Sequence, residues 1–140
     1  MRYRTLGRTG LQVSALALGT VALGMDYGIP TPKTAGYPSW EDATALIHHA
    51  VEAGINLFDT APAYGRAEAV LGAALVDRDG CYVATKVPLP RTTDGLDVHG
   101  WDLRQAIEHS MENSRRTLQC DTLDIVQLHN PTVEILARGE

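Results

Sequence analysis

The order of the apolar segments along the chain predicts an α/β fold built on a parallel sheet. Short apolar runs of strand length alternate with three longer stretches whose apolar residues recur at helical spacing. Turns that contain glycine or proline separate most of these segments. Because parallel neighbours need a crossover connection, this order indicates right-handed strand–helix–strand units. We therefore expect an N-terminal hairpin, about four parallel strands and three helices, in one domain over residues 1–140.

The first segments predict a hairpin, a core strand and a long loop. Residues 1–11 hold Gly7 and Gly10 between short mixed segments, which is typical of a hairpin turn. Residues 13–18 are almost all apolar and precede Gly19, so we expect the first buried strand there. Residues 21–38 are rich in glycine and proline, and we predict that they form a loop.

Two predicted helices flank the second strand. Ser39 and Asp42 have the spacing of a capping box, and the apolar residues of 43–51 form one helical stripe that ends before Gly54. Residues 55–58 are largely apolar, as expected of a strand that is buried on both faces. The second stripe covers residues 67–75 and predicts the next helix.

The last third of the chain repeats the pattern. Residues 82–85 predict a short strand with Lys86 at its end, and a proline-rich loop follows as far as Gly100. Apolar residues recur at helical spacing over residues 103–118, and the apolar run 123–128 predicts the fourth strand.

Composition favours a globular domain whose partners are small molecules. Hydrophobic residues make up 44% of the chain and charged residues 21%. The 12 Lys and Arg residues face 17 Asp and Glu residues, and a net charge of −5 argues against a nucleic-acid partner. No stretch approaches the ~20 apolar residues of a membrane-spanning helix, so we expect no membrane partner and a cytoplasmic location.

Two other kinds of site are not supported by the sequence. Cys81 and Cys120 lie outside any metal-ligand spacing, so we expect two reduced, partly buried thiols and no metal site. Residues 19–24 have the glycine spacing of a phosphate-binding P-loop, but Met25 and Asp26 stand where that motif needs Lys and Ser or Thr.

Four polar side chains follow the predicted strands at their C-terminal ends. Asp59 and Tyr64 come after the second strand, Lys86 after the third and His129 after the fourth. Adjacent parallel strands lie ~4.8 Å apart, and their C-terminal ends are where sheets of this kind carry chemistry. Each residue alone has a purely structural explanation, such as a turn, a packed ring or a strand end. Together they favour a common functional pocket.

These residue types suit proton donation to a carbonyl oxygen. A tyrosine hydroxyl is a poor acid at neutral pH, and an ammonium group beside it stabilises the phenolate form. Lys86 is the candidate for that ammonium, and Asp59 is the candidate carboxylate that keeps it charged. His129 is the candidate for a hydrogen bond to a substrate oxygen. Such a site fits carbonyl reduction by a hydride-donating cofactor.

The motifs around these residues resemble those of the aldo-keto reductase family. The resemblance covers almost the whole chain and rests on five stretches: residues 3–11, Leu18-Gly19-Thr20, Phe58-Asp59-Thr60-Ala61 with Tyr64-Gly65, Ala84-Thr85-Lys86, and Gln127-Leu128-His129-Asn130.

The resemblance implies part of a (β/α)8 TIM barrel that reduces aldehydes and ketones to alcohols with NADPH. It implies Tyr64 as the proton donor, Lys86 and Asp59 as the residues that tune it, and His129 with Tyr64 as substrate contacts. It also implies that the nicotinamide end of NADP(H) is lined by Gly19, Thr20, Val21 and Asp59. Residues 21–38 would border the substrate mouth.

A complete barrel of this type needs ~250 residues, so we expect residues 1–140 to form its N-terminal part and to be inactive alone. Two open sheet edges would then be available for self-association or for a complementing chain. The alternative is a non-catalytic binding or scaffold protein that uses the half-barrel surface. The complete set of four polar residues weighs against it, because a scaffold has no need of Lys86 beside Asp59.

Overall fold

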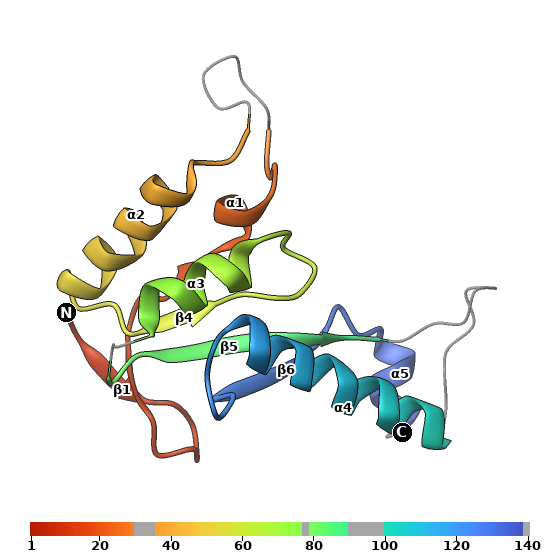
Figure 1. Ribbon diagram of the computed structural model, residues 1–140. Coiled ribbons are helices and arrows are strands. Elements are labelled where there is room, and N and C mark those ends of the chain that lie inside the picture. Colours follow the sequence, from red (N-terminus) through yellow and green to blue (C-terminus); the bar gives the residue numbers. More distant parts are fainter. Residues whose placement is uncertain (30–35, 77–78, 90–99, 139–140) are drawn as a thin grey trace.

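The computed structural model describes residues 1–29, 36–76, 79–89 and 100–138 (Figure 1). Parts of the predicted loops, residues 30–35 and 90–99, lie outside this description. The elements follow in the order β1 (Tyr3–Thr5), β2 (Gln12–Ser14), β3 (Leu18–Gly19), α1 (Val21–Gly24), α2 (Trp40–Glu52), β4 (Leu57–Asp59), α3 (Ala67–Leu75), β5 (Tyr82–Pro88), α4 (Gly100–Thr117), β6 (Ile125–His129) and α5 (Val133–Arg138).

The main sheet is parallel, as predicted. Its strand order is β3-β4-β5-β6, so each strand pairs with its neighbours in the chain and β3 and β6 form the edges. The register pairs Gly19 with Asp59, Asp59 with Ala84, and Lys86 with Gln127. This register brings the C-terminal ends of all four strands together at one end of the sheet.

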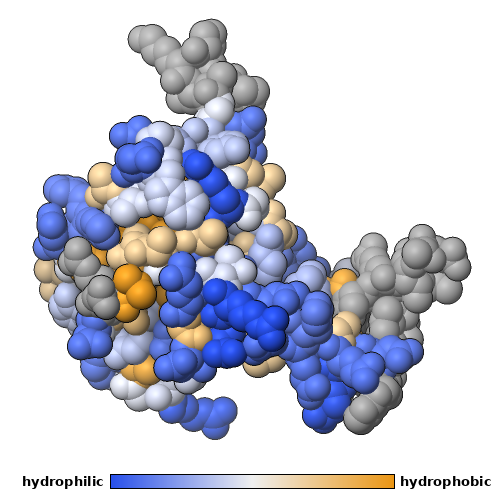
Figure 2. Space-filling model, viewed as in Figure 1, coloured by the Kyte–Doolittle hydropathy of each residue, from blue (hydrophilic) through white to orange (hydrophobic). Residues whose placement is uncertain are grey.

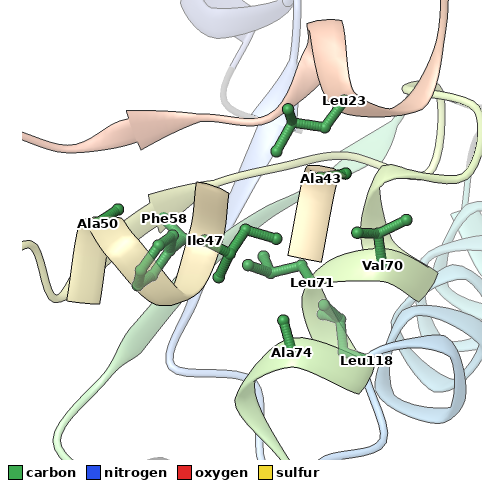
Figure 3. Close-up of a cluster of buried hydrophobic side chains, with 9 residues drawn as sticks. All are labelled: Leu23, Ala43, Ile47, Ala50, Phe58, Val70, Leu71, Ala74 and Leu118. Carbon is green, nitrogen blue, oxygen red and sulfur yellow. The ribbon is translucent and has the colours of Figure 1, made fainter. Parts of the chain in front are cut away.

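The core lies between this sheet and the helices. Figure 3 shows side chains from α1, α2, β4 and α3 directed toward one another, with Leu118 joining them from the end of α4. Phe58, Ile47 and Leu71 have no exposed surface. Most residues of the stripes predicted from the sequence are therefore buried or half-buried, but Leu46 of α2 and Met111 of α4 are 47% and 36% exposed. On the outer side, hydrophilic residues gather over α4 (Figure 2).

The N-terminus of α2 is capped as the sequence predicts. The backbone N–H of Asp42 donates to the Ser39 side chain at 3.0 Å, and the Ser39 hydroxyl donates to the Asp42 carboxylate at 2.8 Å. Gly54 follows the helix with φ at +90°, a conformation that glycine adopts without the steric cost of a Cβ. None of the described helices is long and apolar enough to cross a membrane.

The first core strand differs from the prediction. Val13 and Ser14 belong to β2, which pairs antiparallel with β1, and only Leu18 and Gly19 of the apolar run join the parallel sheet. The reason is Asn56, whose side-chain oxygen accepts from the Ser14 N–H at 2.7 Å and whose amide group donates to the Gln12 carbonyl at 2.9 Å. These side-chain bonds hold β2 beside the start of β4 without continuing the sheet through it.

Two short helices also lie where the sequence predicted none. α1 occupies the start of the predicted loop 21–38, and α5 follows the last strand. Gly24 at the end of α1 explains why this helix fits where it does. A Cβ at Gly24 would lie 1.9 Å from the Tyr64 carbonyl oxygen and 2.5 Å from the Ala67 nitrogen, so only glycine allows this approach.

Candidate active site

The four polar residues of the predicted pocket lie at the end of the sheet where its parallel strands have their C-termini. Asp59 ends β4, His129 ends β6, and Tyr64 lies in the turn between β4 and α3. Lys86 lies inside β5, which continues to Pro88 beyond the predicted strand end because Val87 and Pro88 pair with Leu128 and His129. The structure therefore brings together all four side chains.

An ion pair joins two of these side chains. Lys86 Nζ donates to Asp59 Oδ1 at 2.7 Å and to the Thr60 carbonyl oxygen at 2.9 Å. The Lys86 side chain is 13% exposed, whereas that of Asp59 is 40% exposed. The ammonium group is thus largely withdrawn from solvent and is held by one carboxylate and one carbonyl.

The ring of Tyr64 lies between a cation and an imidazole. Lys86 Nζ is 4.8 Å from the Tyr64 ring centroid, within the range of a cation–π contact. The rings of Tyr64 and His129 meet edge to face, with centroids 5.6 Å apart and an interplanar angle of 88°. The phenol is therefore held by contacts with two neighbouring strands, β5 and β6.

The residues expected near a nicotinamide group lie beside Asp59 but differ in accessibility. Thr20 is fully buried, and both its N–H and its hydroxyl donate to the Asp59 carbonyl oxygen at 2.9 Å. Its side chain supports the end of β4 instead of facing open space. Gly19 is exposed with nothing within 4 Å of an added Cβ, and Val21 at the start of α1 is half-buried. The backbone at Gly19 is thus open beside the half-exposed carboxylate of Asp59.

Sequence reasoning missed three supporting residues behind this site. The Thr85 hydroxyl donates to Glu68 Oε1 at 2.6 Å, and the two residues are only 1% and 4% exposed. This bond ties α3 to β5 at the residue before Lys86. One signal was present, because Glu68 lies three positions before Leu71 on the buried stripe of its helix. Thr60 was also missed, and its buried hydroxyl has no hydrogen-bond partner among the described residues.

The two cysteines lie at the opposite end of the strands. Both are half-buried, reduced thiols, as predicted, and they border a hollow of about 290 Å³ near the starts of β5 and β6. Burial, followed by the nearby Asp124, raises the pKa of the Cys120 thiol. Within the described ranges, no three His, Cys, Asp or Glu side chains are placed to hold a metal ion.

Comparison with known proteins agrees with this arrangement. The model of the Aldo/keto reductase family matches residues 15–135. L-galactose dehydrogenase of Arabidopsis thaliana is 38% identical over 136 residues, which cover 93% of this chain and 38% of that protein. Aldo-keto reductase YhdN of Bacillus subtilis is 35% identical over 137 residues, which cover 94% of this chain and 38% of that protein.

Solved structures give the same answer for the fold. PA4992 of Pseudomonas aeruginosa superposes with a TM-score of 0.73 at 37% identity, over 96% of this chain and 50% of that one. The holo form of aldo-keto reductase AKR11C1 from Bacillus halodurans superposes with a TM-score of 0.72 at 32% identity, over 96% of this chain and 42% of that one.

The parallel sheet, its helices and these superpositions define an α/β protein with part of a TIM barrel, as predicted. The chain belongs to the aldo/keto reductase family. It spans 38% of the length of each of the two relatives named above.

Proposed function

We propose that this chain forms the N-terminal part of an NADPH-dependent oxidoreductase that reduces aldehydes or ketones to alcohols. The observation that carries the proposal is the position of Lys86, which bonds Asp59 at 2.7 Å and lies 4.8 Å from the Tyr64 ring. Membership of the family supports an oxidoreductase. The proposed location is the cytoplasm, and the proposed partner is a small carbonyl compound.

In this proposal Tyr64 donates its phenolic proton to the carbonyl oxygen. Lys86 stabilises the phenolate that remains, and Asp59 keeps the lysine protonated. His129 donates a hydrogen bond to the same substrate oxygen and orients it toward Tyr64. When bound, NADPH supplies the hydride that the carbonyl carbon receives. Tyr64 then regains a proton from solvent, so that one hydride and one proton convert the carbonyl to an alcohol.

The residues of the proposed cofactor site are Gly19, Thr20, Val21 and Asp59. Gly19 offers backbone with no side chain in the way, and the Asp59 carboxylate is 40% exposed. Thr20 acts indirectly, because its hydrogen bonds hold the end of β4 that carries Asp59. These contacts serve only the nicotinamide end of NADPH. We therefore also propose that the isolated chain is inactive and binds NADPH weakly.

Two measurements test these proposals. The first is a titration of the isolated chain with NADPH, followed by the fluorescence of its two tryptophans. We expect no saturation at low micromolar NADPH, because the proposed contacts serve only the nicotinamide end of the cofactor. NADPH-dependent carbonyl reduction by the isolated monomer would contradict the proposed inactivity.

The second measurement uses a chimera in which this chain replaces the matching N-terminal segment of YhdN. We expect carbonyl-dependent oxidation of NADPH, and Tyr64→Phe should lower kcat by about 100-fold or more because the proton donor is lost. NADPH affinity should change little. Tyr3→Phe is the matched control, since the Tyr3 hydroxyl donates to the carbonyl oxygen of Gly54, which follows α2, and lies outside the four-residue site. Equal turnover of the Tyr64→Phe chimera would disprove the role of Tyr64.

A further inference from the structure

Arg66, two residues after Tyr64, contacts two separate segments of the chain. Its guanidinium carbon lies 4.6 Å from the ring centroid of Tyr37 and 5.8 Å from that of Trp40, at the start of α2. Its Nη2 atom donates to the Pro38 carbonyl oxygen. Its backbone N–H donates to the Gly24 carbonyl oxygen at 3.2 Å, at the end of α1. One residue thus joins the Tyr64 turn to both α1 and α2.

The backbones around this contact lie too close together to admit a side chain at Gly24 or Gly65. A Cβ at Gly65 would lie 2.3 Å from the Gly24 carbonyl oxygen, and a Cβ at Gly24 would lie 1.9 Å from the Tyr64 carbonyl oxygen. Gly65 itself has φ at +57°, a left-handed conformation that favours glycine. The end of α1 and the turn that carries Tyr64 are therefore packed backbone against backbone.

A guanidinium group suits the position of Arg66 better than the ammonium group of a lysine would. A planar guanidinium stacks on aromatic rings and donates from several fixed directions, whereas an ammonium on a flexible chain does neither. The Arg66 Nε atom is buried and has no partner in the part of the chain that is described. The side chain is therefore held by the two rings and by the Pro38 carbonyl.

We propose that Arg66 is a positioning residue, whose side chain fixes the turn that presents Tyr64 by anchoring it to the segment that leads into the N-terminus of α2. Its meaning for catalysis rests on the proposed role of Tyr64. The anchoring itself does not, and it can be measured without turnover. No contact of Arg66 with a substrate or cofactor is required.

The test is NMR of the chain with isotopically labelled tyrosine. The chain has five tyrosines, and Tyr64→Phe identifies the Tyr64 signal. Arg66→Met should shift or broaden this signal and, in hydrogen exchange followed by mass spectrometry, should accelerate amide exchange at residues 37–41 and 64–66 by about 10-fold or more, since the lost side chain contacts Tyr37, Pro38 and Trp40. The effect of Arg66→Lys should lie between wild type and Arg66→Met, because lysine keeps the charge but loses the planar contacts. Arg104→Met is the control, since Arg104 is 69% exposed and pairs with Glu108 on α4.

An unchanged Tyr64 signal and unchanged exchange in folded Arg66→Met would overturn the anchoring. In the active chimera, Arg66→Met should lower kcat by about 10-fold with NADPH affinity unchanged, and Arg66→Lys should restore part of the loss. A shifted Tyr64 signal with unaltered kcat would overturn the link to catalysis. Loss of the role of Tyr64 itself is recognised separately, because Tyr64→Phe would then be fully active.

Discussion

The ion pair of Lys86 and Asp59 is asymmetric, because lysine is 13% exposed and aspartate 40% exposed. In Asp59→Asn a largely buried ammonium loses its only carboxylate partner among the described residues, and we expect a loss of about 2 kcal/mol in the free energy of unfolding. In Lys86→Met the aspartate that remains can be hydrated, and we expect the free energy of unfolding to fall by about 1 kcal/mol or less.

Urea unfolding of both variants measures this difference. Glu108→Gln serves as the control, since the Arg104–Glu108 pair is exposed on both sides and its loss should cost about 0.5 kcal/mol or less. A larger loss in Lys86→Met than in Asp59→Asn would show that burial of the ammonium does not govern the pair.

The sequence alone was sufficient to select Asp59, Tyr64, Lys86 and His129, because each follows a predicted strand and the C-terminal ends of parallel strands lie together. It was not sufficient for Arg66. The partners of Arg66 lie 26 to 42 positions earlier in the chain, and only the packing of α1 and α2 brings them close. Whether the four selected residues perform the proposed chemistry stays a prediction.

Helix α4 carries a charge cluster whose contribution depends on pH. Hydrogen bonds from Arg115 and then Arg116 lower the pKa of Glu112 from its ordinary value of 4.5 to about 2. Because the pKa is lower in the folded state, the pairing stabilises the fold above pH 4.5 and is lost as the pH falls toward 2.

We therefore expect wild type to have a slightly higher melting temperature than Glu112→Gln near neutral pH, with the difference vanishing as the pH falls toward 2. Thermal unfolding followed by circular dichroism at several pH values measures it. Glu108→Gln again provides the comparison on the same helix. A difference that grows below pH 4.5 would contradict this account.

At the level of whole elements, periodicity predicted well where an element was long. The stripes of α2, α3 and α4 extend over several turns, so their period was readable. α1 has four residues and forms through the contact of Gly24 with the Tyr64 turn, which no local pattern reveals. The division of residues 13–18 between β2 and β3 was likewise hidden, because it depends on the side chain of Asn56.

The molecule as a whole presents an open edge at β6. This strand ends the described sheet, and Val126 and Leu128 on it are 38% and 43% exposed. Unpaired strand edges with apolar side chains favour association with another chain. We therefore propose that the chain self-associates, or binds a complementing chain, through this edge.

Analytical ultracentrifugation measures whether the chain self-associates through the edge at β6. Leu128→Lys should weaken self-association by about 10-fold, since it replaces an exposed apolar side chain of the edge strand with a charge. Gln127→Lys, which adds the same charge to an exposed polar position of β6, should have a smaller effect. A wild-type chain that remains monomeric up to about 100 μM would rule out self-association through the edge.

Asn56 has a consequence for the timing of folding. Its side chain bonds Gln12, Ser14 and Gly80, so the docking of the hairpin depends on residues that are synthesised 42 or more positions after Ser14. During translation β1 and β2 therefore cannot form these bonds until Asn56 and Gly80 have been synthesised. In refolding, pulsed hydrogen exchange should show protection of the Ser14 amide only after that of the β4 and β5 amides. Protection of the Ser14 amide before that of the β4 and β5 amides would mean that the hairpin docks without the hydrogen bonds of Asn56.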